Sequence, residues 1–552
     1  MKKSVTSAAM TAALAAVLAT PALAQNTAPS SGAGNWPVYN GNSTSTRFSP
    51  LNEINTGNVQ TLTVAWIHQP GVIGQGLMET PLVVDGVVYS IGSNDRVFAL
   101  DGATGNEIWH YYPHLGDIVN EIAFSQLARG VAIGNGRVYI GTVDGYGIAL
   151  DQKTGKEIWN TQLLDTRKCK GCNFTSPPVV AGKTLVYGGT GGELPGIGKI
   201  LGVDPDTGKI IWTFEVLKDD PKSWGGDSRL SGGGGAWMPG FYDAQTNTVF
   251  YGTANPAPDY DWGNARPGDN LYTSSVVALD PDTGKLKWYH QQVPHDVWDY
   301  DAAAGQFMMI DHDGRRTLLH RNKGGFTFLY DPADGKIQNV WQFNKYVNWV
   351  RGIDPKTGEL IDRQDPKMGE KNYACPWLVG NWESNSYSPQ TGLMYATAVE
   401  ACMTIDIQKQ PPETVPLSSY YFGGTPSPAK TPDGQAYSHL DARDPLTGKV
   451  AWQVNSDIPL YSSALSTGGD LVFMGDAKGV AHAYDAKTGK ELWTFNLGSG
   501  IRGGPVTYEA GGHQYVAFPS GLGGFGGAFI AQLWLNMADY PQGAALVAFR
   551  LK

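Results

Sequence analysis

Hydrophobic and polar residues alternate with a period of two over many short stretches of this chain. In "VYIGTVDGYGIAL" (138–150) the alternation is followed by an Asp, a few polar residues and a Thr-Gly pair, and a second stretch then ends on Trp159. Such alternation is typical of β-strands with one buried face, and glycine supplies the positive φ that a tight turn requires. Each unit therefore predicts a β-hairpin that presents a large ring at a fixed position.

The unit occurs seven times, and its copies end at Trp109, Trp159, Trp212, Trp288, Trp341, Trp452 and Trp493. An eighth tryptophan, Trp66 in "LTVAWIHQ", lacks a preceding turn. We expect the C-terminal stretches "QYVAFPSG" (514–521) and "ALVAFRL" (545–551) to complete its sheet. Repeats of this kind are typical of ring-like architectures. The sequence predicts an all-β fold, an eight-bladed β-propeller with tryptophan-docking repeats, closed by the two ends of the chain.

The spacing of the repeats also predicts long inserted loops. The widest intervals lie between Trp212 and Trp288 and between Trp341 and Trp452. Loops of this size in a compact protein are usually functional, so we expect them to cover the face that carries the active site. Residues 25–552 are interpreted as one propeller domain.

The first 24 residues are interpreted as a secretory signal peptide. Lys2 and Lys3 precede an Ala/Leu-rich run that ends in Ala22-Leu23-Ala24, a small-residue cleavage pattern. No later run reaches the ~18 apolar residues that a membrane span needs. We therefore expect a periplasmic protein without a membrane span.

Composition excludes two further classes. With 71 glycines, 17 tryptophans and only 17% charged residues, the chain is unlike a disordered protein. Its net charge of -10 argues against nucleic acid as a partner, because that affinity depends on Lys and Arg neutralising phosphates.

The four cysteines predict two disulfides in an oxidising compartment, Cys169 with Cys172 and Cys375 with Cys402. A zinc half-site at "KCKGCN" would lack its second C-x-x-C pair. Asn173 also excludes a c-type haem site, which needs histidine at that position.

The segment "PHDVWDYDA" (294–302) concentrates titratable groups around one tryptophan, with His295, Asp296, Asp299 and Asp301 flanking Trp298. One interpretation is an ordinary solvated loop. The other is a cation site with a spare base. His295 and Asp296 have no assigned chemistry, and we expect them to shape the loop that presents Asp299.

Two longer motifs add a family resemblance. The repeat, together with "ANPAPDYDWGNARPGDNLY" (254–272) and "PHDVWDYD", resembles the pyrroloquinoline quinone (PQQ)-dependent alcohol dehydrogenases of the methanol/ethanol dehydrogenase type. The resemblance covers essentially the whole chain after the signal peptide. It implies a quinoprotein that oxidises an alcohol and passes electrons to a separate soluble cytochrome c.

The resemblance also implies a set of cofactor-binding residues. Trp237 would stack flat on the quinone, Arg129 would face its carboxylates, and Lys323 would lie near the reactive carbonyls. The full set is Glu79, Arg129, Thr175, Ser176, Gly191, Gly192, Trp237, Lys323, Asn381 and Trp382. Taken singly, each of these residues has an alternative interpretation as packing or as a solvated side chain.

The implied metal ligands are Glu193, Asn255, Asp299 and Asp301. All four offer hard oxygen donors, which suit Ca²⁺. Asp301 resembles the additional carboxylate of the lanthanide-using branch, because a trivalent ion calls for more negative charge around it. The metal is therefore a lanthanide(III) or Ca²⁺.

The implied mechanism assigns catalytic roles to Asp299 and Lys323. Asp299 would remove the hydroxyl proton as general base, the metal would act as Lewis acid on the quinone carbonyl, and Lys323 would steady the charge on the reduced quinone.

Two departures from the family pattern affect the expected substrate. Ala123 and Phe124 stand where adjacent cysteines often form a disulfide ring, so Phe124 could replace that platform. Gly235 stands where threonine is frequent, leaving room or losing a hydrogen bond. Both favour an alcohol larger than methanol: a primary or secondary alcohol, a polyol or a sugar-like compound.

Two rival functions and one assembly question remain at this stage. A non-catalytic propeller scaffold that binds protein partners would keep the repeats but lose the cofactor residues. A six-bladed sugar dehydrogenase would have to explain eight tryptophan positions. The sequence leaves a homodimer open.

Overall fold

The computed structural model describes residues 1, 32, 34–263, 265–377, 382–523, 533–534 and 540–552. Apart from Met1, the predicted signal peptide lies outside them. Helices are short: α1 (Pro221–Trp224) and the 3₁₀ turns η1 (Val59–Thr61), η2 (Ser93–Asp95), η3 (Asp117–Asn120), η4 (Asp227–Ser231) and η5 (Pro412–Thr414). None of the described helices has the length and apolar character to cross a bilayer.

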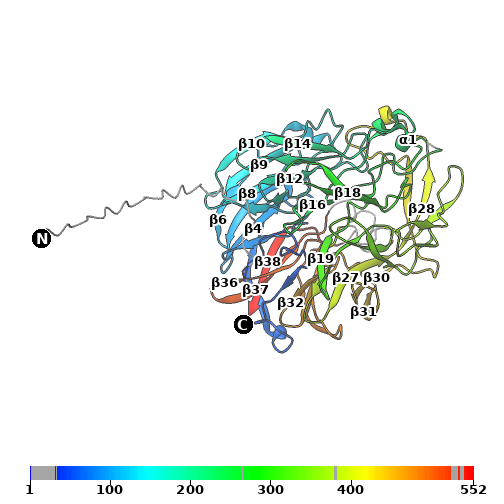
Figure 1. Cartoon of the computed structure of the whole chain (residues 1–552). Coiled ribbons are helices and arrows are strands. Elements are labelled where there is room, and N and C mark those ends of the chain that lie inside the picture. Colours follow the sequence, from blue (N-terminus) through cyan, green and yellow to red (C-terminus); the bar gives the residue numbers. More distant parts are fainter. Residues whose placement is uncertain (2–31, 33, 264, 378–381, 524–532, 535–539) are drawn as a thin grey trace.

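The fold is an all-β propeller of mostly antiparallel sheets (Figure 1). Within the described residues seven sheets have four strands and one has five. Three sheets follow one another along the first part of the chain: β3 (Leu82–Val84), β4 (Val87–Gly92), β5 (Arg96–Asp101) and β6 (Glu107–Tyr111); β7 (Ala132–Gly134), β8 (Arg137–Gly141), β9 (Tyr146–Asp151) and β10 (Glu157–Gln162); β11 (Val179–Ala181), β12 (Thr184–Gly188), β13 (Lys199–Val203) and β14 (Ile210–Glu215).

Four more sheets come from the middle and the later part of the chain: β15 (Phe241–Asp243), β16 (Thr248–Gly252), β17 (Ser275–Leu279) and β18 (Leu286–Gln291); β19 (Phe307–His312), β20 (Arg315–Arg321), β21 (Phe326–Tyr330) and β22 (Ile337–Gln342); β26 (Ser386–Ser388), β27 (Leu393–Glu400), β30 (Tyr437–Arg443) and β31 (Val450–Ser456); β1 (Phe48–Ser49) with β32 (Leu465–Thr467), β33 (Leu471–Gly475), β34 (Val480–Asp485) and β35 (Glu491–Asn496).

The remaining four-stranded sheet joins the two ends of the chain. Strand β2 (Leu62–His68) pairs antiparallel with β38 (Ala545–Leu551), which continues to β37 (His513–Ser520) and β36 (Val506–Ala510). In Figure 1 the red β38 accordingly lies among the blue N-terminal strands. The expectation that the C-terminal stretches complete the sheet of Trp66 is confirmed.

Each repeat contacts the sheet that follows it through its tryptophan. The indole N–H of Trp109 donates to the carbonyl of Gln152 at 3.1 Å, and that of Trp159 donates to Pro205 at 2.9 Å; both carbonyls lie in the turn of the next sheet. The turn glycines have positive φ, and a Cβ on any of them would lie 2.5–2.7 Å from the ring of the preceding tryptophan. They are Gly105, Gly155, Gly208, Gly284, Gly335, Gly448 and Gly489.

The long interval after Trp341 contains two extra sheets. One is the hairpin of β23 (Gly352–Ile353) and β24 (Leu360–Ile361), built on "IDPKTGEL", a copy of the repeat turn without its tryptophan that the sequence analysis missed. The other joins β25 (Asn372–Ala374), β28 (Cys402–Ile407) and β29 (Gly424–Ala429). The disulfide between Cys375 and Cys402 joins the residue that follows β25 to the first residue of β28. A second disulfide joins Cys169 and Cys172. Both predicted disulfides are confirmed.

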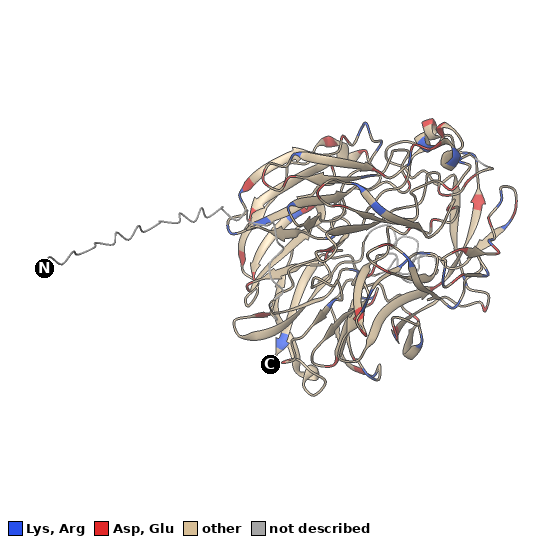
Figure 2. Ribbon diagram, viewed as in Figure 1, with Lys and Arg blue, Asp and Glu red and all other residues tan. Residues whose placement is uncertain are grey.

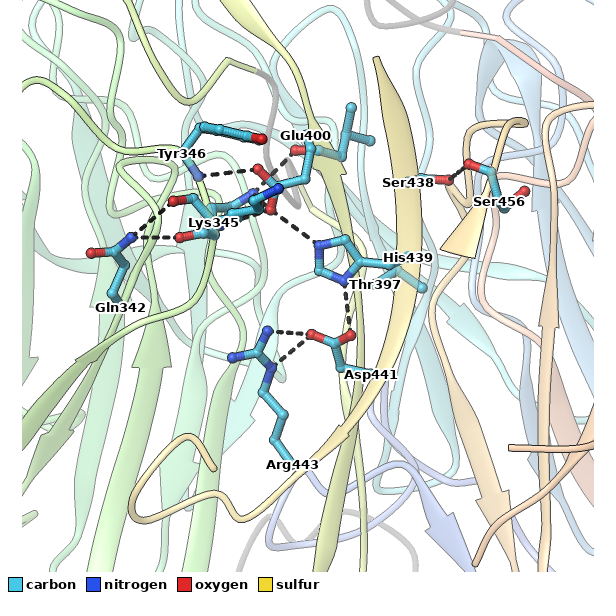
Figure 3. Close-up of polar contacts among 12 residues, drawn as sticks. Gln342, Lys345, Tyr346, Thr397, Glu400, Ser438, His439, Asp441, Arg443 and Ser456 are labelled. Carbon is cyan, nitrogen blue, oxygen red and sulfur yellow. Dashed lines mark hydrogen bonds and ion pairs between the residues drawn. The ribbon is translucent and has the colours of Figure 1, made fainter. Parts of the chain in front are cut away.

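Charges of both signs are interspersed over the outer strands and loops (Figure 2). A buried ion network lies beneath them on β27 and β30 (Figure 3). His439 lies between Asp441 at 2.9 Å and Glu400 at 3.1 Å, and Arg443 pairs with the other oxygen of Asp441. Glu400 also accepts the backbone N–H of Lys345, which anchors the loop after β22. Burial opposes the charged imidazolium, but the hydrogen bonds and charges of the two carboxylates outweigh it and raise the pKa of His439 to about 9.

We predict that Gly155→Ala destabilises the protein more than Gly136→Ala. Both glycines have φ near +69°, but a Cβ at 155 would meet the ring of Trp109 while a Cβ at 136 would meet nothing within 4 Å. The conformational cost, about 1–2 kcal/mol, is common to both variants, and overpacking adds about 1–3 kcal/mol at 155. Thermal unfolding of the two variants measures the difference. Equal midpoints would show that the ring does not constrain this turn.

The His439 network predicts a pH-dependent stability. The pKa of His439 is about 9 in the folded chain and about 6.5 in an unfolded one, so the charged form contributes fully below pH 6.5. That contribution, about 3 kcal/mol at most, is lost as the pH rises from 6.5 through 9. We expect the midpoint of thermal unfolding to fall over this window in the wild type and to fall less in His439→Gln. Parallel curves would contradict the assignment.

Candidate active site

One cavity gathers side chains from the loops that join the strands of different sheets. The lining residues are Met78, Phe124, Leu127, Arg129, Thr175, Thr190, Gly191, Glu193, Trp237, Asp299, Lys323, Trp382, Tyr420, Phe422 and Arg502. Functional side chains are often carried by loops that a rigid scaffold positions. The cavity therefore combines contributions from sequence positions more than four hundred residues apart.

Trp237 forms a polar and aromatic wall of the cavity with Arg129. The guanidinium carbon of Arg129 lies 5.1 Å from the ring centroid of Trp237, and its Nη1 donates to the hydroxyl of Thr175 at 2.5 Å. The hydroxyl of Ser176 donates to the carbonyl of Trp237 at 2.7 Å. The Trp237 indole N–H donates to Asp301 Oδ2 at 2.8 Å. These bonds fix the orientation of the ring between the basic and the acidic parts of the site.

Three carboxylates meet at the acidic end. Glu193, Asp299 and Asp301 offer oxygens that all lie within 4.8 Å of one another. Lys323 Nζ lies 2.6 Å from Asp299 Oδ1 and 3.1 Å from Asp301 Oδ2. One ammonium therefore faces three acids in a place with little water.

The shifted pKa values of these groups follow from the excess of three carboxylates over one ammonium group. Burial, followed by the charge of Asp301, raises the pKa of Glu193 to about 7. Burial also holds the pKa of Asp299 well above its usual range, with Asp301 and Glu193 adding to the effect and Lys323 opposing it. Although burial disfavours its charge, the three carboxylates raise the pKa of Lys323 above its ordinary value. The group as a whole favours an additional cation.

Asn255 lies beside the three acids with its amide oriented. Its Nδ2 donates to Asp259 Oδ1 at 2.6 Å, and its backbone N–H donates to Asp301 Oδ1 at 2.7 Å. Within the described ranges, its Oδ1 is buried without a hydrogen-bond partner, as is Asp259 Oδ2. A Cβ on Gly192 would lie 2.6 Å from Asn255 Oδ1, so only glycine permits this approach next to Glu193.

The segment 294–302 is not a solvated loop. Asp296 is fully buried, and its carboxylate accepts the backbone N–H of Trp298 at 2.9 Å and that of Tyr300 at 2.8 Å. Asp299 between them has φ +67°. The carboxylate of Asp296 thus folds the turn that presents Asp299, which confirms its expected structural role. His295 also has a structural place, with its Nδ1 3.0 Å from the carbonyl of Gly268.

Arg266 joins this turn to the loop of Asp259. It is fully buried and donates to the carbonyls of Pro258, Asp259 and Asp296. The loop of the candidate metal ligand Asn255 and the loop of Asp299 are therefore held at a fixed separation.

Several expected residues lie behind the cavity wall. Glu79 is fully buried, with its carboxylate oxygens accepting from the hydroxyl of Ser90 and the backbone N–H of Ile91, and it does not line the cavity. Ser176 and Gly192 also lie outside the lining, whereas Thr175, Gly191 and Trp382 belong to it. Asn381 lies outside the described residues.

The two departures from the family pattern have different outcomes. Phe124 offers its ring as a platform in the cavity, whereas Gly235 leaves no space for a larger ligand. Phe124 lines the cavity, with its ring centroid 5.0 Å from that of Tyr420. The expectation that Gly235 leaves room is wrong. A Cβ at 235 would lie 2.3 Å from the backbone nitrogen of Gly191, so the two loops already touch.

Sequence reasoning missed seven residues of this site: Met78, Leu127, Thr190, Asp259, Tyr420, Phe422 and Arg502. Asp259 lies inside the quoted motif 254–272, where its proximity to Asn255 was a usable signal. Tyr420 and Phe422 belong to the long interval before Trp452, which was expected to reach the active-site face. No signal in the sequence pointed to Arg502.

The residues fit both a hard cation and an anionic aromatic ligand. Oriented oxygen donors, including the unpartnered Oδ1 of Asn255, are what Ca²⁺-like and trivalent ions require. Arg129 has a buried Nε without a hydrogen bond beside Trp237 and Trp382, which suits a planar ring with carboxylates.

Comparisons with known proteins agree with this chemistry. The family "PQQ: Glucose/ethanol/alcohol dehydrogenase, beta-propeller domain" matches residues 36–347 and 364–516. The quinoprotein alcohol dehydrogenase PedH of Pseudomonas putida is 34% identical over 540 residues, covering 92% of this chain and 89% of that protein. The quinoprotein ethanol dehydrogenase of Pseudomonas aeruginosa is 34% identical over 567 residues, covering 92% and 88%.

Solved structures give the same result. A quinohemoprotein alcohol dehydrogenase, ADHIIG from Pseudomonas putida HK5, superposes with a TM-score of 0.87 at 32% identity, covering 94% of this chain and 80% of that one. A europium-containing methanol dehydrogenase superposes with a TM-score of 0.87 at 30% identity, covering 94% and 98%. Family match, relatives and site chemistry lead to one conclusion: the chain belongs to the PQQ-dependent quinoprotein alcohol dehydrogenases.

Proposed function

We propose that this protein is a periplasmic dehydrogenase that oxidises an alcohol larger than methanol to an aldehyde or ketone. The observation that carries the proposal is the joining, in one cavity, of Asp299 and Lys323 with the aromatic wall of Trp237. Phe124, Tyr420 and Phe422 add apolar lining, which favours a substrate with a carbon chain or ring.

The proposed cofactor contacts are Arg129, Thr175, Gly191, Trp237, Lys323 and Trp382 from the cavity lining, with Ser176, Gly192 and Glu79 supporting the wall and Asn381 included by resemblance. The proposed metal ligands are Glu193, Asn255, Asp299 and Asp301. When bound, PQQ supplies the two-electron acceptor and the metal supplies a Lewis acid.

In the proposed mechanism Asp299 accepts the hydroxyl proton of the alcohol. Asp299 lines the cavity, and its backbone has a φ of +67°. The hydrogen bond from the Trp298 N–H to Asp296 holds the turn that presents it, so its carboxylate needs little rearrangement to reach a substrate. Lys323, 2.6 Å away, holds one oxygen of Asp299 and leaves its other oxygen to receive the proton. Its ammonium also offers positive charge toward the bound ring.

The metal is proposed to be a lanthanide(III), with Ca²⁺ as the alternative. Support comes from the total of four carboxylates, because Asp259 adds its charge behind Asn255 to those of Glu193, Asp299 and Asp301. One of the superposed structures is described as a europium-containing methanol dehydrogenase. A trivalent ion offsets such a cluster better than a divalent one.

Architecture and partners complete the proposal. The eight sheets would be the blades of a single domain over residues 25–552, each docked on the next through its tryptophan. Residues 1–24 would direct export, and electrons would pass to a soluble cytochrome c. A homodimer is compatible with the proposal.

We expect Asp299→Asn to lower the turnover number by about 10²–10⁴-fold, because a general base of this kind contributes that much. PQQ binding should remain, since the amide keeps the shape of the carboxylate. Dye-linked alcohol oxidation measures turnover, and absorbance of the bound quinone measures loading. Asp313→Asn, at an exposed hairpin turn, serves as the control. Retained activity in Asp299→Asn would rule out its role as base.

The test of the function is alcohol oxidation by the purified apoprotein given PQQ, with Ca²⁺ or La³⁺ in parallel and alcohols from methanol to bulky secondary alcohols. We expect activity only with PQQ and higher activity with La³⁺. Asp301→Ala should lose most of the La³⁺-dependent activity, about tenfold or more, since one ligand and its charge are removed. Absence of PQQ binding and of activity with both metals would favour the scaffold function.

A further inference from the structure

Arg502 is a second buried arginine on the cavity wall, beside Arg129. It lies between β35 and β36 and is 2% exposed. Its Nη1 donates to the carbonyl of Gly523 at 2.7 Å, while its Nε has no hydrogen-bond partner among the residues that the structure describes. The nearest carboxylate oxygen, Glu383 Oε1, lies 3.7 Å from Nε and is likewise without a hydrogen bond. The ion pair is therefore too long to satisfy either group.

The two arginines of the cavity share an aromatic neighbour. The guanidinium carbons of Arg129 and Arg502 lie 5.4 Å and 5.1 Å from the ring centroid of Trp382. Burial lowers the pKa of Arg129 to about 10, and the charge of Arg502 acts in the same direction. Two buried like charges with unused N–H donors therefore lie near each other on the cavity wall.

Buried charges without adequate partners are unfavourable unless a ligand completes them. The cavity separates its charges, with Glu193, Asp299 and Asp301 around Lys323 at one end and two guanidiniums at the other. Glu383 sets one negative charge against the two guanidiniums. The basic end therefore calls for an anion, and guanidinium donors suit carboxylates in particular.

We propose that Arg502 is a second guanidinium contact for the carboxylates of PQQ. The proposal rests on the proposed function, in which PQQ occupies this cavity. Arg129 and Arg502 would together bind the carboxylate-bearing edge of the ring, while Lys323 and the metal ligands serve its reactive edge.

The experiment is titration of the full-length apoprotein with PQQ, followed by tryptophan fluorescence quenching and calorimetry. We expect the dissociation constant to rise about tenfold or more in Arg502→Met, because a charge-assisted hydrogen bond is lost, and to rise less in Arg502→Lys. Arg321→Met is the matched control. Arg321 is also buried, stacks on Phe343 at 4.5 Å and donates to the carbonyl of Thr397, but it does not line the cavity. Its affinity for PQQ should stay within about twofold of the wild type.

A second measurement identifies the group that Arg502 contacts. Methyl esterification of PQQ removes the carboxylate charges, so the wild type should lose more affinity for the ester than Arg502→Met or Arg502→Lys does. If Arg502→Met does not fold, as judged by thermal unfolding, Arg502→Lys carries this comparison alone.

Three outcomes would overturn the proposal. The first is an unchanged PQQ affinity in Arg502→Met. The second is an equal loss with PQQ and with its ester. The third is an unchanged PQQ affinity in Arg502→Met together with a KM that rises more for hydroxy acids than for neutral alcohols. That result would make Arg502 a substrate contact. If the wild type itself binds no PQQ, the proposed function fails instead, and the two failures are thereby distinguished.

Discussion

The packing of a tryptophan ring against the turn glycine of the next sheet is the interaction on which this structure depends. Among the described residues each of these rings except that of Trp493 occupies the space where a side chain on the turn would lie, and its N–H satisfies a turn carbonyl. The contact fixes both the distance and the rotation between neighbouring sheets. Because the pairing of β2 with β38 joins the chain ends in one sheet, these local contacts also fix where the loops between strands converge.

Convergence of those loops creates an electrostatic arrangement that no single segment contains. Glu193 comes from one loop and Asp299 and Asp301 come from another, yet their oxygens lie within 4.8 Å of one another. Such a cluster is unfavourable by itself, and Lys323 offsets only part of it. The fully buried Arg266 and Asp296 hold the surrounding loops by bonds to the backbone, so the cluster cannot relax by moving apart. The rigid support is what makes the site suited to a cation.

The basic end of the cavity follows the same principle with the opposite charge. Within the described part of the chain Arg129 and Arg502 both keep a buried Nε donor unused, although Nη1 of Arg129 donates to Thr175 and Nη1 of Arg502 donates to Gly523. Placed at the two ends of one apolar cavity, the acids and the arginines give a ligand a single favourable orientation. Family membership and this charge separation are independent observations that agree on a quinone with carboxylates.

The sequence by itself determined the strands of the tryptophan repeats, the turn glycines and the joined chain ends, because these depend on local periodicity, and it determined both disulfides through an even number of cysteines in an exported chain. It also contained Asp299, Asp301, Glu193 and Asn255 within recognisable motifs. Only the tertiary structure decided that Glu79 lies behind the wall, that Gly235 has no free space, and that Asp259 and Arg502 belong to the site. The physical reason is that burial and proximity depend on how separate loops pack, and nothing in a segment such as "GIRGGP" records which side chain will face it across the cavity.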